Sequence, residues 1–238
     1  MFARHPVFSR FRNEALDALL HAASPVRLQR NEPLWRVGER SAHFTLVARG
    51  LVVVLAPCGP AREVLLGIAS EGDGVGEAAA LTGEARNDDA YGFTTPTEVL
   101  RVPREPVIEL LERSGPTALA YAQRIGELRA NADRRVRSLT KNSDGRIAEV
   151  LLGLAARFGE ELGPGSVYIP LRITRAQLAA MVGTTVETAI RTVSKWTREG
   201  VVGARGPGMV VHDVPALAGI AAVPLEQLGA LGALTRIA

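Results

Sequence analysis

Residues 173–196 read ITRAQLAAMVGTTVETAIRTVSKW, and this stretch carries the clearest structural signal in the chain. Thr174 followed by Gln177 fits a capping box, in which each side chain bonds to the backbone of the other residue. A helix is therefore predicted to begin there. Gly183 stands where a glycine would end that helix, because glycine adopts the left-handed conformation of a helix C-terminus without strain.

A second helix is predicted to open at once, because Thr184 followed by Glu187 fits another capping box. Val186, Ile190 and Val193 have helical spacing, and we expect this face to turn towards the first helix. Two helices joined by a very short turn that contains glycine predict a helix-turn-helix.

The second helix, expected over residues 185–197, has a polar side suited to DNA. That side carries Thr185, Glu187, Thr188, Arg191, Thr192 and Lys195. Arginine can donate two hydrogen bonds to guanine, and glutamate can accept one from the amino group of cytosine. We therefore expect Glu187 and Arg191 to read bases. The residues expected to contact phosphates and set the register are Arg175, Thr185, Thr188 and Lys195.

A simpler alternative is that Glu187 only caps the helix and that Arg191, one turn later, is its ion-pair partner. The surrounding helix-turn-helix favours base reading. The two roles are compatible, since a carboxylate has two oxygens.

The residues after the second helix are typical of a wing. Val201–Val202 and 209–211 are strand-like, and 205–208 read RGPG, which predicts a turn between them. The sequence therefore predicts a winged helix-turn-helix.

The N-terminal half has a different sequence pattern. The first apolar residues, over 8–23, have helical spacing and predict a short amphipathic helix. From Val26 to about Val102, short β-prone runs at 44–47, 51–55 and 64–66 alternate with glycine and proline turns. Many short strands with frequent turns indicate a sandwich or a barrel.

A long helix is predicted between these two parts. Its narrow apolar seam consists of Ala118, Ala122, Ile125, Ala132, Val136 and Leu139. Such a seam often pairs with a copy of itself, so we expect a homodimer. The alternative is a helix that packs only on its own domain.

Composition excludes several classes of protein. The net charge of +3 is a mild indication of a nucleic-acid partner. No apolar run approaches the roughly 20 residues that span a bilayer, and the N-terminus has no apolar signal-peptide centre, so no membrane partner and cytoplasmic residence are expected. Cys58 is the single cysteine, which excludes an intrachain disulfide and a CxxC metal pair. No nucleophile, metal or phosphate-loop motif supports an enzyme or a metal site.

The sequence resembles the family of the cyclic-AMP receptor protein and the fumarate–nitrate reduction regulator (Crp/Fnr), from about Phe8 to Ala221. The most specific part is Gly183 to Arg191, with its signature Glu187-Thr188-x-x-Arg191. Upstream, residues 145–152 resemble the first helix of the family's DNA-binding domain. The segments that resemble the family's sensory strand pairs are 30–39, 46–52 and 72–77.

The resemblance implies an α+β fold with three parts and a tail. The parts are an N-terminal β-roll sensor (a double-stranded β-helix, jelly-roll-like) over 1–115, a central dimerisation helix over 116–141 and a C-terminal winged helix-turn-helix over 142–223. Residues 224–238 form a tail. The implied partners are double-stranded DNA, a second copy of the chain and RNA polymerase.

The resemblance also bears on the DNA site. Val186 stands where the fumarate–nitrate branch has valine, which indicates a half-site similar to TTGAN rather than TGTGA. Ile190 stands where that branch has serine, so the outer bases are not fixed. Two-fold symmetry predicts a near-palindromic operator, with recognition helices about 34 Å apart, one turn of B-DNA.

The effector is not determined by the sequence. The residues that correspond to the family's effector pocket are Gly76, Glu77, Arg86, Asn87, Asp88 and Asp89. Asn87 replaces the family's hydroxyl residue and two carboxylates follow, which disfavours a cyclic-nucleotide phosphate. With Cys58 alone, an iron–sulfur cluster is excluded within one chain.

Haem stays open as an alternative, with axial ligands from His5, His21, His43 or Cys58. A haem-based gas sensor, a constitutive regulator and an effector-binding module that acts through a protein partner are the remaining alternatives.

Overall fold

The computed structural model describes residues 5, 7–10, 13–58 and 63–231. The chain divides into two compact units. The first comprises Met1–Pro57 and Leu66–Ala130, and the second comprises Asn131–Arg236 with Cys58–Leu65. Within the described part of the chain, no helix is long and apolar enough to cross a membrane.

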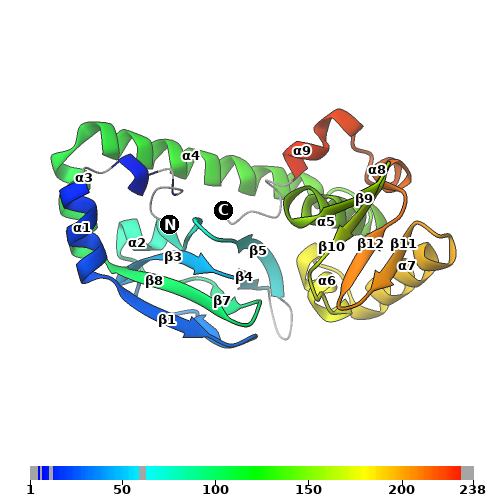
Figure 1. The fold of residues 1–238 in the computed structure, drawn as a ribbon, viewed down its shortest axis with the longest axis horizontal. Helices are drawn as coiled ribbons and strands as arrows, with labels where there is room; N and C mark the ends of the chain where they lie inside the picture. Colours follow the sequence, from blue (N-terminus) through cyan, green and yellow to red (C-terminus); the bar gives the residue numbers. More distant parts are fainter. Residues whose placement is uncertain (1–4, 6, 11–12, 59–62, 232–238) are drawn as a thin grey trace. The chain divides into compact units, whose positions relative to one another are not determined.

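Two four-stranded sheets build the first unit (Figure 1). One has the order β1 (Ser24–Leu28), β8 (Thr97–Pro103), β3 (His43–Arg49) and β6 (Gly74–Val75). The other has the order β2 (Pro33–Trp35), β7 (Asp89–Gly92), β4 (Val52–Pro57) and β5 (Glu63–Ala69). Three of these strands contain the β-prone runs of the sequence, which confirms that part of the prediction.

The sheets enclose one core between them. It contains Leu28, Val47, Val75 and Val99 from the first sheet and Leu34, Trp35, Val52, Val54, Ala69 and Ala90 from the second. Because side chains alternate along a strand, β3 and β8 have a second apolar face for other partners.

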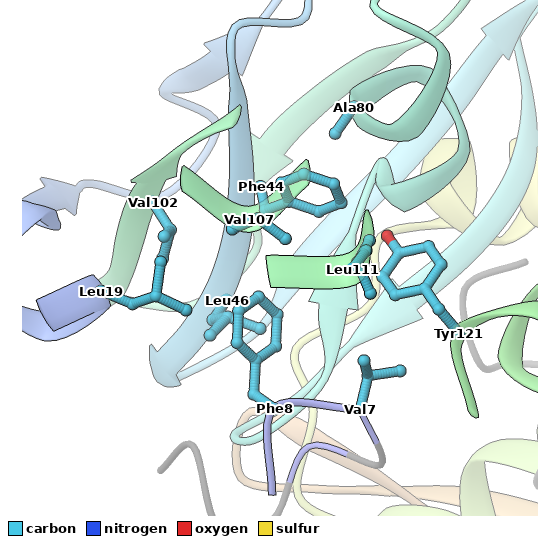
Figure 2. Packing of buried hydrophobic residues seen from close by; sticks show 10 residues of the cluster. All are labelled: Val7, Phe8, Leu19, Phe44, Leu46, Ala80, Val102, Val107, Leu111 and Tyr121. Carbon is cyan, nitrogen blue, oxygen red and sulfur yellow. The ribbon is translucent and has the colours of Figure 1, made fainter. Parts of the chain in front are cut away.

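Helices cover that second face. They are α1 (Asn13–Ala22), α2 (Glu77–Thr82), α3 (Arg104–Arg113) and α4 (Gly115–Ser138). Figure 2 shows the cluster, in which Phe8, Phe44 and Tyr121 meet between the β3 strand and the helices. The rings of Phe44 and Tyr121 lie edge to face, with centroids 5.7 Å apart.

The N-terminal helix is shorter than predicted. In place of one helix over 8–23, the structure has a 3₁₀ turn, η2 (Phe8–Arg10), followed by α1. The helical spacing of apolar residues arose because both elements direct buried side chains, Phe8 and Leu19, into the same core.

The second unit is a smaller mixed domain. Its helices are α5 (Ser143–Phe158), α6 (Arg175–Val182), α7 (Val186–Arg198) and α8 (Val214–Ala221). Its sheet has the order β11 (Val202–Arg205), β12 (Gly208–Val211), β10 (Ser166–Ile169) and β9 (Glu160–Gly163). A sandwich domain, a long helix and a winged helix-turn-helix confirm the predicted fold class.

The predicted tail, 224–238, begins with η3 (Leu225–Gln227) and α9 (Leu228–Leu231). Residues 232–238 lie outside the described residues.

Candidate nucleic-acid interface

The helix-turn-helix has the caps that the sequence predicts for its first helix. The Thr174 hydroxyl accepts a hydrogen bond from the Gln177 N–H at 3.1 Å, and the Gln177 side chain accepts one from the Thr174 N–H at 3.0 Å. Gly183 ends α6 in the left-handed conformation, with a φ of 65°. These caps confirm both the start of α6 and its glycine stop.

The second cap was predicted one residue too early. The N-cap of α7 is Thr185, whose side chain accepts from the Thr188 N–H at 3.2 Å. The hydroxyl of Thr184 lies instead 3.2 Å from that of Ser143, at the start of α5. Either of two adjacent threonines can cap a helix. Because the Thr184 side chain contacts Ser143 of α5, Thr185 caps α7.

The rotation of α7 also differs from the prediction. Its buried face consists of Ala189, Thr192, Val193 and Trp196. Val186 and Ile190 do not face α6, because 39% and 47% of their surfaces are exposed. Thr192, which was expected on the exposed side, is only 3% exposed.

A hydrogen bond explains the burial of Thr192. Its hydroxyl donates to the Asp144 carboxylate, in the first turn of α5, at 2.7 Å. Trp196, at 1% exposure, anchors the same face in the core. These contacts fix α7 about its own axis. Asp144 is thus a positioning residue, and nothing in the local sequence marks it as one.

Glu187 and Arg191 project from the opposite, exposed side of α7. The pKa of the Glu187 carboxyl lies below its ordinary value, because its own backbone N–H and the Thr185 side chain hydrogen-bond to it. Glu187 is therefore an ionised acceptor at neutral pH. Within the described residues no ion pair joins Glu187 to Arg191. An ion pair of Glu187 with Arg191, one part of the alternative, is therefore not favoured, whereas the hydrogen bonds to the Glu187 carboxyl fit its other part, a capping role.

The four residues expected to contact phosphates belong to both helices of the helix-turn-helix. Thr185 and Lys195 are exposed, and Thr188 is half-buried. Arg175 occupies the first turn of α6, and burial lowers the pKa of its guanidinium. The N-terminus of α7 adds a favourable partial positive charge for an anion.

The wing has the predicted form. Strands β11 and β12 pair antiparallel, with Arg205 opposite Gly208. Gly206, at a φ of 53°, and Pro207 make the turn between them. Strand β12 also pairs with β10, so the wing belongs to a larger sheet that supports it.

The six residues of the predicted dimer seam differ in their exposure in the structure. Ala122, Val136 and Leu139 are exposed, and Val136 reaches 64%. Ala118 and Ala132 are half-buried. Ile125 is also half-buried, because it packs against the helix-covered core of the first unit. Leu119, at 61% exposure, is a further exposed apolar residue of α4 that was not predicted.

Three of the six predicted effector residues, Gly76, Glu77 and Arg86, contact other residues of the first unit. Glu77 is buried, and its carboxylate lies 3.2 Å from both Arg124 on α4 and His5. Arg86 donates to the Gly76 carbonyl at 2.6 Å and stacks on the Trp35 ring, 4.0 Å from its centroid. A Cβ on Gly76 would collide with that guanidinium.

The remaining three are distributed along the same segment. Asp88 accepts a hydrogen bond from the Trp35 indole at 2.8 Å, and burial raises the pKa of its carboxyl. Asp89 accepts from the Val37 N–H, and Asn87 is exposed. A phosphate would have to displace the contacts of Arg86 and meet the charge of Asp88, so these residues do not fit a cyclic nucleotide as they stand.

Two of the four haem-ligand candidates, His5 and His21, make hydrogen bonds within the first unit. His5 accepts from the Val7 and Phe8 N–H groups at Nδ1 and contacts Glu77 at Nε2, so both ring nitrogens are engaged. His21 bonds the Asp17 carbonyl, and Cys58 is exposed. No group of three metal-ligating side chains occurs among the described residues.

A sandwich domain of this topology, a long helix and a braced helix-turn-helix are together typical of transcription regulators. Comparison with known proteins agrees. Residues 25–114 match the family described as cyclic nucleotide-binding domain, and residues 145–220 match the Crp-like helix-turn-helix domain. The chain belongs to the Crp/Fnr family of transcription regulators.

The relatives found include both branches of that family. A "CRP-like cAMP-activated global transcriptional regulator" of Mycobacterium tuberculosis is 26% identical, over 92% of this chain and 97% of that protein. The "fumarate and nitrate reduction regulatory protein" of Salmonella typhi is 24% identical, over 87% and 82%. The solved structure of the c-di-GMP responsive global regulator CLP of Xanthomonas campestris shares the fold, with a TM-score of 0.69 at 23% identity, over 84% of this chain and 99% of that one.

Proposed function

We propose that this regulator binds a near-palindromic operator as a homodimer and reads each half-site with α7. In this proposal Glu187 and Arg191 contact bases, and Arg175, Thr185, Thr188 and Lys195 contact phosphates. The observation that carries it is the exposed and mutually unpaired Glu187 and Arg191 on a helix whose rotation is fixed by Thr192 and Trp196. Fixed donors and acceptors discriminate bases better than mobile ones.

The domain boundaries follow the same proposal. Residues 142–223 bind DNA, 116–141 form the dimer contact and 1–115 hold the sensor. Support for the dimer comes from α4 and the turn after it, where Leu119, Val136 and Leu139 expose more than half of their surfaces. Burying these side chains against a second copy would remove apolar area from water.

RNA polymerase is the proposed protein partner, since a transcription regulator acts through it. Cytoplasmic residence also remains our prediction, because the target is DNA. We expect no enzymatic turnover.

Selection of bound sites from random DNA, followed by footprinting at physiological salt, tests the proposal. We expect two inverted half-sites similar to TTGAN, with centres about 34 Å apart. A flat, salt-sensitive response without sequence preference would contradict it and would favour a module that acts through a protein partner.

A further inference from the structure

Two large apolar side chains lie on the otherwise polar exposed side of α7. Val186 and Ile190 are one helical turn apart, and Ile190 is the more exposed of the two. The buried face of α7 is already formed by Ala189, Thr192, Val193 and Trp196, so neither side chain is needed for packing within the domain. Both side chains are therefore available for an apolar contact with a partner of α7.

The geometry of the helix places this apolar pair beside the proposed base readers. Successive residues of an α-helix are turned by about 100°, so Val186 and Ile190 form a row next to the row of Glu187 and Arg191. A surface that Arg191 can reach therefore also faces Ile190. Lys195 and Arg198 extend the positive charge along the same exposed helix, which favours a polyanion over an apolar protein partner.

The major groove offers one apolar group to such a side chain, the C5-methyl of thymine. We propose that Ile190 is a specificity-determining residue that packs against this methyl group, in a base pair next to the one that Arg191 reads. This inference rests on the proposed function and adds a base preference to it.

The chemistry of Ile190 supports thymine against the other bases. Isoleucine has no donor or acceptor, so it would leave the amino group of cytosine or adenine without a partner when it excludes water from it. Its branched Cβ restricts the first side-chain torsion to few rotamers, so little conformational entropy is lost when the contact forms.

Replacing thymine by uracil in the selected operator tests this contact, because it deletes only the methyl group. We expect one thymine position in each half-site to be sensitive: its replacement weakens binding of the wild-type protein by about fourfold per half-site, the value of one buried methyl group. Ile190→Ser should bind the thymine operator more weakly and should lose the difference between thymine and uracil. Ile190→Val should retain most of it.

Leu162→Ser is the matched control, since Leu162 is an exposed apolar residue on β9, in the same unit but outside α7. It should bind like the wild type and show the same uracil sensitivity. Thermal unfolding of each variant establishes that the domain is intact.

The inference is overturned if no thymine is sensitive to loss of its methyl group, or if Ile190→Ser remains as sensitive as the wild type. Sensitivity that disappears in Val186→Ala but persists in Ile190→Ser would overturn it as well and assign the contact to Val186. If the wild-type protein selects no sequence at all, the proposed function itself fails, and that result differs from specific binding that ignores the methyl group.

Discussion

Arg191 and Glu187 lie one turn apart on α7, and within the described residues no ion pair joins them, so Arg191 does not use its donors on Glu187. We expect Arg191→Ala to weaken operator binding by about 1–3 kcal/mol and to relax the preference at one base pair. Anisotropy titrations against operators with single-base changes measure both effects.

Lys195→Ala serves as the control for Arg191→Ala. Loss of a phosphate contact should lower the affinity for all sequences alike and reduce the salt slope by about one. If Arg191→Ala behaved in that way and left the sequence preference unchanged, Arg191 would be a phosphate contact and not a base reader.

Thr192 acts on DNA recognition only through the position of α7. Thr192→Val keeps the shape of the side chain but removes the donor to Asp144, so a half-buried carboxylate loses a partner. We expect a loss of about 1–3 kcal/mol in the free energy of unfolding, together with weaker specific binding. Urea unfolding followed by tryptophan fluorescence measures the first effect, since Trp196 lies on the same face.

A matched variant for this prediction is Thr197→Val, because among the described residues the Thr197 hydroxyl bonds to the Val193 carbonyl of its own helix and to no other group. It should change stability little. Equal effects of the two substitutions would show that the contact with Asp144 does not stabilise α7.

For whole elements, the ends of helices could be predicted from the sequence and their rotation could not. Thr174, Gln177 and Gly183 define the ends of α6 through contacts within a few residues. The rotation of α7 depends on Asp144, 48 residues away from Thr192 in the sequence. The predicted apolar row of Val186, Ile190 and Val193 has helical spacing, but with Thr192 and Trp196 on the buried face only Val193 of that row lies inside.

For the long helix α4, too, the sequence pattern predicted the helix but not which of its residues are packed. Its apolar seam was predicted, but the pattern did not distinguish Ile125, which packs on its own core, from Val136, which is exposed. Ile125→Asp would therefore damage the first unit as well as a dimer. Substitutions at the exposed positions separate the two effects.

We expect Leu119→Asp and Val136→Asp each to weaken the dimer at least tenfold, because each would place a charge in an apolar contact between copies. Sedimentation velocity over a range of concentrations measures the dimer. Val37→Asp, which changes an exposed valine of the first unit away from α4, is the control and should leave the dimer intact. A dimer that persists in both α4 variants would remove α4 from the interface.

Across the whole molecule, the succession of strands, long helix and winged helix-turn-helix could be predicted because each part has its own periodicity. The interior of the sandwich domain could not be predicted. Glu77 and Arg86 matched a family pocket by position, yet Glu77 pairs with Arg124, 47 residues further along the chain. A buried ion pair between distant residues has no local sequence signal.

That ion pair connects three segments of the first unit. Glu77 begins α2, Arg124 lies on α4, and His5 belongs to the N-terminal segment. The Tyr121 hydroxyl also donates to the Glu77 carbonyl, at 3.4 Å. Burial alone would raise the pKa of the Glu77 carboxyl, but the hydrogen bond with His5 and the charge of Arg124 outweigh it and lower the pKa below its ordinary value of 4.5.

A lowered carboxyl pKa in the folded protein makes stability depend on pH. The contribution of Glu77 is fully present above its unfolded pKa of about 4.3–4.5 and is lost as the pH falls through the folded value. We expect the free energy of unfolding of the wild type to decline below about pH 4.5 and that of Glu77→Gln to decline less steeply there. The slopes of the two curves against pH should differ by the equivalent of up to one bound proton. Urea unfolding between pH 3 and 7 measures both slopes, and identical slopes would contradict the assignment.

Arg124→Met tests the same ion pair by changing its other residue. It leaves the Glu77 carboxylate buried without its cation, so we expect a loss of about 3–5 kcal/mol at neutral pH. Adding Glu77→Gln to Arg124→Met removes the uncompensated charge, and the double variant should therefore be more stable than Arg124→Met alone. Strictly additive losses would mean that the two side chains do not interact.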